Sequence, residues 1–515
     1  MRLGLRAFGA GTAAMLGLAL VISVALPSAA QQAASKVTVT VVGIDRSGNQ
    51  VAIQSSVVPL QGNAVPSNGP TYQIAPGTYY IGASVPTVTG GTTASDSIVI
   101  RRVDITASET IKLDARGGKL VSVWLNGKDL GSPAMAGGCI RGGFGVIYPS
   151  GAPQLYVKPV SVAHVGFDWT ASVPGPGTST RDLAGGSKAG LPANPVYRIS
   201  SSQLVPTVIK AKAGPVPDTA VTWSTFVTAA DGCGLPGARG IASLPGSVTD
   251  YRSPGSWRTE VDTNRGNGTY SCSTTWANQN YAAGHRYALP FDSAAHGPSQ
   301  AVPVVVGNLL SFDPSPAYQF SDPHQSGYEY CNTVTVTLSR AGRTVKSRQY
   351  TGYSGPVTDF SATVRAGWYV LTVNSKQSEP NQAMPAALLS PRTSLRWRFK
   401  IGHGAVPVAV MSFLPEGLNM RNGAAPGSVS TIKAWATQNR YLFRSGSASA
   451  AKTFSVQVSF NGGKSWHAAG VVRHKGYWTV RVHNPKSGYV SIRSTTVNAA
   501  GESSVQTIYR AYRIG

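Results

Sequence analysis

Residues 454–460 read Phe-Ser-Val-Gln-Val-Ser-Phe, and an Asn-Gly-Gly turn follows at 461–463. Strict alternation of this kind predicts a β-strand with one apolar and one polar face. Asparagine and glycine tolerate positive φ, so the turn predicts a hairpin. Two more strand-like runs lie at 477–482 and 489–493, and a last one at 506–514 has an ambiguous in/out register. The end of the chain is therefore predicted to be a small antiparallel β-sandwich.

The composition extends this prediction to the whole chain. Of 515 residues, 58 are glycine and 34 are proline, while only 13% are charged and 42% are hydrophobic. That apolar fraction is high enough to bury cores, and frequent Gly and Pro punctuate many short strands. We expect an all-β protein built from about three to four tandem antiparallel β-sandwich modules, with prealbumin-like or immunoglobulin- and fibronectin-III-like folds.

Changes in pattern along the chain suggest where these modules begin and end. After a signal peptide, we expect four modules: a first sandwich, a loop-rich β domain that carries cysteines, a further sandwich, and a basic immunoglobulin-like sandwich. The predicted boundaries are 1–30 for the signal peptide, then 31–135, 136–302, 303–430 and 431–515.

The N-terminus has the pattern of a secretory signal peptide. Arg2 and Arg6 precede an apolar run over 13–26, and small residues lead to a predicted cleavage site after Ala30. The run is shorter than the roughly 20 residues needed to cross a bilayer. We expect a mature protein that is secreted, lacks a membrane span after cleavage, and is extracellular or associated with the cell wall.

The charge is strongly positive and unevenly distributed. The formal net charge is +24, and residues 391–515 hold 17 lysines and arginines against only Glu416 and Glu502. A basic surface attracts polyanions through its summed potential, an attraction that weakens as salt rises. An anionic cell-wall polymer or polysaccharide is therefore one expected partner, and solubility without a partner is the alternative.

Four cysteines stand in this predicted exported chain: Cys139, Cys233, Cys272 and Cys331. An even number in an oxidising compartment predicts two disulfides, for which three connectivities are possible. The sequence contains no Cys-x-x-Cys, so neither a zinc knuckle nor a redox motif is expected.

The sharpest alternation of the chain lies at 395–401, Leu-Arg-Trp-Arg-Phe-Lys-Ile. A period of two places the four apolar residues on one face of a strand, where Trp397 belongs to a core. It places Arg396, Arg398 and Lys400 side by side on the other face. This row is the candidate binding ridge for an anionic partner, and an ordinary solvated strand face is the alternative.

No pattern of catalytic residues stands out. Gly177-Thr178-Ser179 has the Gly-Thr-Ser of subtilisin-like nucleophiles, but Thr-Arg-Asp follows where a small or apolar helix start is needed. No pair of carboxylates has a spacing that argues for a glycosidase. We therefore expect a non-enzymatic protein without catalytic residues, bound metal or cofactor, although a site assembled from dispersed residues stays possible.

Two short motifs resemble known structural units. The Pro-Gly-Thr-Tyr turn at 76–79 lies between alternating strands and resembles the carboxypeptidase regulatory-like family of prealbumin-type sandwiches. Residues 459–466, Ser-Phe-Asn-Gly-Gly-Lys-Ser-Trp, are similar to an Asp-box hairpin, with Asn461 in place of the acid. The Asp-box resemblance implies a hairpin whose polar side chain bonds its own backbone while Trp466 packs onto the apolar face.

From about Pro192 to the end, the chain resembles the non-catalytic C-terminal region of large secreted subtilisin-like serine proteases of actinobacteria. The protease domain itself has no counterpart, so the resemblance implies a secreted, multi-sandwich accessory region without protease activity. The segments that carry it are 191–198, 295–298, 397–399, 458–460, 463–466, 488–493 and 507–512.

Together these observations predict a secreted, non-enzymatic, modular β-sandwich protein that binds or scaffolds at the cell surface through its basic C-terminal region. One alternative is an accessory or substrate-binding partner of a secreted hydrolase, such as a protease. Another is a carbohydrate-binding protein with a flat row of exposed aromatic side chains. A single Arg-Gly-Gly unit at 141–143, without a nucleic-acid-binding fold signature, gives no reason to expect a specific nucleic-acid partner.

Overall fold

The computed structural model describes most of the chain beyond the predicted signal peptide, which lies outside the described residues. The described residues are 36–66, 69–140, 145–147, 152–215, 218–227, 235–264, 271–298, 303–314, 322, 325–329, 331–351, 360–378, 384, 386, 388–401, 406, 408–437 and 451–515.

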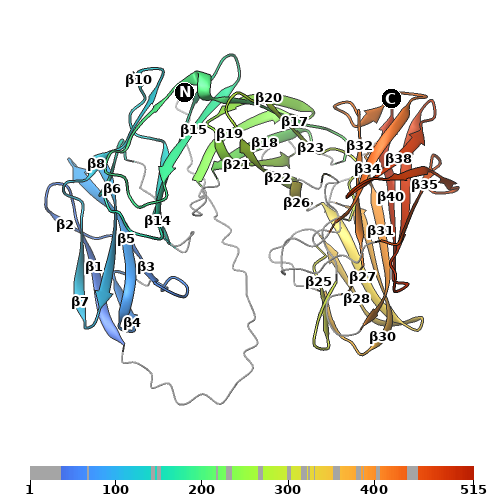
Figure 1. The fold of residues 1–515 in the computed structure, drawn as a ribbon, viewed down its shortest axis with the longest axis horizontal. Helices are drawn as coiled ribbons and strands as arrows, with labels where there is room; N and C mark the ends of the chain where they lie inside the picture. The colour runs from blue at the N-terminus through green and yellow to red at the C-terminus, as the bar shows by residue number, and fades with distance from the viewer. Residues whose placement is uncertain are drawn as a thin grey trace.

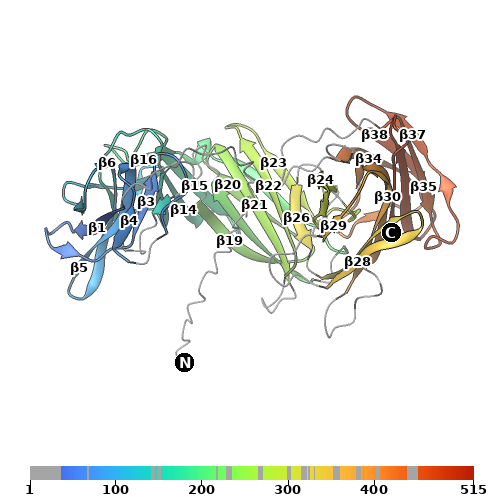
Figure 2. The same ribbon diagram turned by 90° about the horizontal axis from the view of Figure 1, so that it is seen from below.

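The protein is all-β, as predicted. The described part of the chain forms forty strands in eight sheets, and its one helical element is the short 3-10 turn η1 at Ser201–Gln203. Within these residues, no helix has the length and apolarity needed to cross a membrane. The sheets follow one another along the molecule from the N-terminal strands, drawn in blue, to the C-terminal strands, drawn in red (Figure 1; Figure 2).

The first sandwich packs two sheets over a core of alternating valines, isoleucines and tyrosines, including Val39, Tyr72 and Ile81. The Pro-Gly turn at 76–77 separates two strands that belong to different sheets, so it carries the chain from one layer to the other. One sheet contains β1 (Val37–Ile44), β2 (Gln50–Val51), β4 (Thr71–Ile74) and β7 (Glu109–Asp114); the other contains β3 (Ser55–Pro59), β5 (Gly77–Thr89), β6 (Thr92–Ile105), β8 (Lys119–Leu120) and β13 (Gln154–Val157).

A second core lies between this second sheet and the next layers, and it buries Ile98, Phe167 and Trp169 completely. A small sheet contains β9 (Ser122–Leu125), β10 (Lys128–Asp129) and β16 (Val196–Ile199). A seven-stranded sheet contains β11 (Met135–Ile140), β12 (Gly145–Ile147), β14 (Val165–Pro174), β15 (Thr180–Ser187), β17 (Val205–Ala211), β20 (Gly246–Arg252) and β23 (Tyr287–Phe291).

A third core, with Trp223, Trp257 and Phe291, joins the seven-stranded sheet to a five-stranded one. The strands that contain Trp257 and Trp276 belong to this five-stranded sheet. It contains β18 (Ala220–Val227), β19 (Leu235–Ser243), β21 (Gly255–Asn264), β22 (Ser271–Tyr281) and β26 (Gln325–Glu329).

The C-terminal part is organised by one nine-stranded sheet. It contains β27 (Asn332–Arg340), β28 (Arg343–Thr351), β30 (Gly367–Gln377), β31 (Arg392–Ile401), β33 (Gly423–Ala424), β35 (Thr453–Ser459), β36 (His467–Ala468), β39 (Gly488–Val497) and β40 (Ser503–Ile514). Two smaller sheets accompany it: β24 (Val304–Val306), β25 (Leu309–Phe312) and β29 (Phe360–Thr363) in one, and β32 (Val410–Pro415), β34 (Val429–Thr437), β37 (Gly470–Arg473) and β38 (Trp478–His483) in the other.

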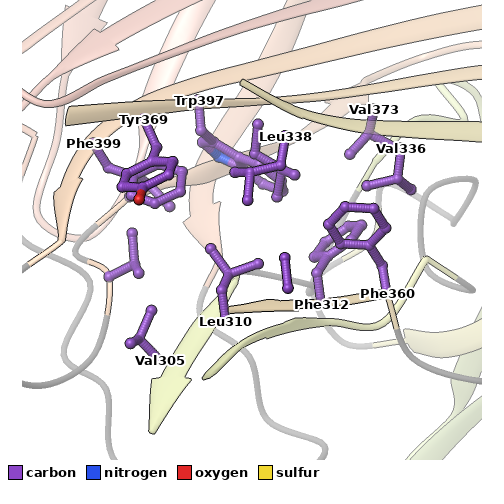
Figure 3. Packing of buried hydrophobic residues seen from close by; sticks show 14 of the residues in the cluster. Val305, Leu310, Phe312, Val336, Leu338, Phe360, Tyr369, Val373, Trp397 and Phe399 are labelled. Atoms are coloured by element: carbon purple, nitrogen blue, oxygen red, sulfur yellow. The ribbon is translucent and has the colours of Figure 1, made fainter. Parts of the chain in front are cut away.

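The two smaller sheets lie over different halves of the nine-stranded one, so a single sheet supports two cores. In the first core, Trp397 and Phe399 of β31 face Leu310 and Phe312 of β25 (Figure 3). In the second core, residues of β39 and β40 pack against β32, β34 and β38. The strands predicted at the end of the chain are all present, with Asn461-Gly462-Gly463 in the turn after β35.

The predicted module boundaries stay predictions, but the sheets show how neighbouring units are connected. Leu155 and Val157 of β13 belong to the sheet of β6, beyond the expected boundary at 135. Met411 and Phe413 of β32 belong to the last core, before the expected boundary at 431. Neighbouring cores therefore share sheets and do not form separate units along the chain.

Truncation of Trp397 tests the core position of β31. Its indole is fully buried and donates a hydrogen bond from Nε1 to the Ala409 carbonyl at 3.0 Å. We expect Trp397→Ala to lower the free energy of unfolding by about 3–5 kcal/mol, because it leaves a cavity and an unpaired carbonyl. Arg396→Ala, on the solvent side of the same strand, should change it by less than about 0.5 kcal/mol. Denaturant unfolding followed by circular dichroism measures both, and equal effects would contradict this assignment of faces.

Candidate functional site

Strand β31 presents a row of cations to solvent. The inward residues Leu395, Trp397, Phe399 and Ile401 are all buried, which confirms the predicted apolar face. The outward positions alternate with them along the strand. Arg392, Arg396, Arg398 and Lys400 are exposed, and the remaining outward position, Ser394, is half-buried. The predicted ridge therefore extends by one arginine, at 392, to four cations in five successive outward positions.

The sheet around this row carries no acidic side chain. None of the nine strands of the sheet contains aspartate or glutamate. The carboxylate beside β31 is Glu502, in the turn before β40; it is buried and accepts hydrogen bonds from the Lys400 backbone N–H at 3.1 Å and from Asn498 Nδ2 at 2.7 Å. The neighbouring strands β30 and β40 present uncharged side chains beside the row, including Thr372, Ser503 and Tyr509, with Lys376 as a further cation. The face is thus positive and rich in hydroxyl groups, with no competing anion on its strands.

Three arginines of this face lie over aromatic rings, each with its guanidinium about 4 Å from a ring centroid. Two of the rings, Tyr509 and Trp466, also contact each other edge to face, with centroids 6.4 Å apart. The pairs are Arg398 over Trp368 at 3.9 Å, Arg392 over Tyr509 at 3.9 Å, and Arg493 over Trp466 at 4.0 Å.

The Asp-box-like hairpin positions one of these rings. Asn461 Oδ1 accepts a hydrogen bond from the Ser465 backbone N–H at 2.9 Å, and Trp466 Nε1 donates to the Gly463 carbonyl at 3.0 Å. The hairpin is therefore fixed by its own polar atoms, as predicted. Trp466, however, lies half-buried against Tyr509 and Arg493 on the outward face instead of in the core.

A bulge explains the ambiguous pattern of the last strand. The β39–β40 register shifts between Val490 and Ile492, and Arg510 adopts a φ of 50°. Ile508 and Tyr512 both pair with inward residues of β39, so even-numbered positions face inward on both sides of the bulge and Tyr509 faces outward, while Ala511 is buried out of turn. Sequence periodicity alone gives no indication of this shift.

One of the two predicted disulfides is confirmed with both partners. Cys272 of β22 is bonded to Cys331, which lies shortly after β26. Cys139 of β11 is also disulfide-bonded, and Cys233 lies outside the described residues. The Cys272–Cys331 bond joins β22 of the five-stranded sheet to the residue directly before β27, and so links the middle of the chain to the start of the nine-stranded sheet.

A second polar cluster lies inside the middle core. Arg252 is fully buried and donates from Nε to Asp250 Oδ2 at 2.6 Å, while Asp182 accepts hydrogen bonds from Thr225 and Ser172 at 2.6 and 2.7 Å. Burial, followed by the charge of Asp182, raises the pKa of Asp250 to about 7. Both carboxyl groups are enclosed, so this cluster braces β15 and β20 and offers no surface to a substrate.

A buried segment at 292–298 connects the middle sheets to the C-terminal part. Asn422 accepts a hydrogen bond from Ala294 N–H at 2.9 Å and donates to the Asp292 carbonyl at 2.9 Å. The Asp292 side chain is fully buried, and its carboxyl oxygens have no hydrogen-bond partner in the described part of the chain. Burial, together with nearby Asp218, raises the pKa of Asp292 to about 8, and burial lowers the pKa of His296 to about 3.

Metal-binding geometry is not found in the part of the chain that the structure describes, where no three His, Cys, Asp or Glu residues form a group that could hold an ion. Of the histidines in the last sandwich, His474 stacks on Tyr477 with ring centroids 4.7 Å apart, and His467 stacks on Phe460 at 6.5 Å. These side chains pack against separate aromatic neighbours.

Comparison with known proteins gives no family. No protein-family model matches the sequence, and no curated protein matches it. The solved structures that resemble it include the TIE protein of Bacillus anthracis, at 10% identity over 70% of this chain and 72% of that one, with a TM-score of 0.14. Another is the native conformation of Escherichia coli alpha-2-macroglobulin, at 9% identity over 93% of this chain but 36% of that one, also with a TM-score of 0.14. The resemblance to actinobacterial protease regions therefore stays a prediction.

Removal of the Cys272–Cys331 bond should weaken the link between the middle and C-terminal sheets. The bond closes a loop with a sequence separation of 59 residues, for which the chain-entropy estimate is about 4 kcal/mol. We expect the double variant Cys272→Ser and Cys331→Ser, with the Cys139 bond intact, to unfold at a correspondingly lower denaturant concentration. An unchanged midpoint would show that the sheet contacts alone hold this junction.

Asp292 should make stability depend on pH. Its pKa is near 3.9 in an unfolded chain and about 8 in the folded protein, so the folded state retains a proton that the unfolded state releases. The contribution of Asp292 to stability is therefore greatest below about pH 4 and declines as the pH rises towards 8. Asp292→Asn removes this titration while conserving shape.

The measurement is the unfolding free energy of both proteins between pH 4 and pH 9. We expect the unfolding free energy of the Asn variant to rise relative to that of the wild type as the pH increases over this range, by roughly a few kcal/mol at the upper end. Asp104→Asn, at an exposed position in β6, provides the matched control and should run parallel to the wild type. Parallel curves for all three proteins would contradict the assignment of a buried, protonated Asp292.

Proposed function

We propose that this protein is a secreted, non-enzymatic, modular β-sandwich protein that binds an anionic polymer at the cell surface. The binding surface is the outward face of the nine-stranded sheet, centred on Arg396, Arg398 and Lys400 of β31. The signal-peptide pattern and the disulfides support an extracellular location, because disulfides persist in oxidising compartments.

One observation carries this proposal: four exposed cations follow one strand, on a sheet whose strands contain no acid. Like charges at successive outward positions repel one another, and here no exposed carboxylate of the sheet relieves that repulsion. An anionic chain lying along β31 would relieve it. Attraction of this kind raises the association rate and is reduced by salt.

A partner role beside a secreted hydrolase, such as a protease, is the second candidate. It rests on the resemblance of residues 192–515 to accessory regions of secreted proteases. The carbohydrate alternative, based on exposed aromatics, receives less support from this face. Trp368, Tyr509 and Trp466 each have an arginine over one ring surface, and that surface is then not free to stack on a sugar.

Retention on an immobilised anionic polymer tests the proposed function. The mature chain should bind immobilised poly(glycerol phosphate) at low ionic strength and elute as the salt concentration rises. It should not be retained on a neutral dextran matrix. The triple variant Arg396→Gln, Arg398→Gln, Lys400→Gln should bind at least about tenfold more weakly.

A matched variant distinguishes the effect of the ridge on binding from the effect of net charge. Lys112, Lys119 and Lys128 are exposed strand lysines of the N-terminal part, and replacing all three by Gln removes the same charge. This control should bind like the wild type. No salt-sensitive retention of the wild type, or an equal loss in both triple variants, would overturn the proposal.

A further inference from the structure

Three arginines of the outward face lie over aromatic rings, with the guanidinium carbon 3.9–4.0 Å from the ring centroid. A guanidinium lying flat on an aromatic ring keeps its N–H donors in its own plane, pointing past the ring edge. The stack reduces the rotamer freedom that an arginine loses on binding. Its donors are therefore positioned in advance for two parallel hydrogen bonds to an oxyanion.

These stacks also connect four neighbouring elements of the sheet. Arg398 of β31 reaches across to β30, whereas Arg392 of the same strand reaches in the other direction, to β40. Arg493 of β39 contacts the hairpin that follows β35. The oriented guanidinium groups thus spread over both sides of the β31 row rather than forming a single point charge.

The spacing along β31 indicates a chain with regularly repeated charges. Outward residues of a strand recur every two residues, about 6.6 Å apart, so Arg396, Arg398 and Lys400 form a row with that repeat. Neighbouring phosphates joined by a three-carbon polyol have a comparable separation, and such a flexible chain can follow a twisted strand.

The occupied ring faces also bear on the type of ligand. Proteins that bind single-stranded nucleic acids stack bases on free aromatic faces. Here a guanidinium covers a face of Trp368, Tyr509 and Trp466, and the donors that remain accessible are those of arginine and lysine. This arrangement suits a ligand that presents oxyanions without bases.

We infer that the outward face binds a phosphodiester-linked polyol chain, and that Arg392, Arg398 and Arg493 act as oriented clamps for its phosphate groups. This inference rests on the proposed function and specifies its ligand. Lys400 and Arg396 supply charge along the row, whereas the stacked arginines supply paired hydrogen bonds to the phosphate oxygens.

The test removes the planar guanidinium groups while conserving their positive charge. In the triple variant Arg392→Lys, Arg398→Lys, Arg493→Lys, every cation stays but the planar fork is lost. Equilibrium binding of the mature protein at low ionic strength is measured with three probes of matched charge number: a glycerol phosphate oligomer, poly-L-glutamate and oligothymidylate. The double variant Arg46→Lys, Arg198→Lys is the control, because these arginines stack on Tyr156 and Trp124 in the N-terminal part. Circular dichroism and the unfolding midpoint verify that each variant is folded.

We expect the wild type to prefer the glycerol phosphate oligomer. The clamp variant should lose about tenfold in affinity for that probe, with the control variant unchanged. An unchanged affinity of the clamp variant, or an equal loss in the control variant, would overturn the clamps while leaving anionic binding intact. Preference of the wild type for poly-L-glutamate or oligothymidylate would overturn the ligand class. Absence of binding to all three probes would overturn the proposed function itself.

Discussion

The pairing of β31 with β40 is the interaction on which the C-terminal part depends. Residues 393–398 form an antiparallel ladder with residues 503–508, more than 100 positions later in the chain. Without this ladder, the strands over the first core and those over the second would end in two unpaired edges, which promote aggregation. With it, one continuous sheet supports both cores. Its outer surface is correspondingly wide, and β31 lies near the middle of it.

The same pairing determines what the outer surface can do. Arg392 meets Tyr509 because β40 is the neighbour of β31, and Arg493 meets Trp466 because β39 and β35 follow in order. A strand with the sequence of β31 at a sheet edge would present its cations to water on several sides. In the middle of the sheet they project from one plane, with ordered neighbours on both sides.

Sequence patterns predicted the local parts of this arrangement well. Alternation assigned Trp397 to the core and Arg396, Arg398 and Lys400 to the other face, because a strand reverses its side chains at every residue. The turn at 461–463 was also evident, since its residues tolerate positive φ. These features depend on chemistry within a few residues.

The remaining parts depend on contacts that no local pattern encodes. Nothing in residues 392–401 indicates that β40 lies alongside, and so nothing indicates a ring beneath Arg392. The bulge at Arg510 interrupts the alternation of β40 and buries Ala511 next to Tyr512, which is why the register of 506–514 could not be determined from the pattern. The pattern of the hairpin alone assigns Trp466 to the apolar face, because the strand residues that it contacts, Arg493 and Tyr509, lie elsewhere in the sequence.

Burial of acids makes the exterior more positive than the composition suggests. Within the described residues, eight acidic residues are buried, whereas Arg252 is the one buried cation. Burial also raises the pKa of Asp250 to about 7 and that of Asp292 to about 8, so at neutral pH Asp292 is mostly protonated and Asp250 only partly ionised. The formal charge of +24 counts them as fully ionised. The field that an approaching polymer experiences is therefore set by exposed lysines and arginines with few exposed acids to oppose them, and it is strongest where the strands contain no acid at all.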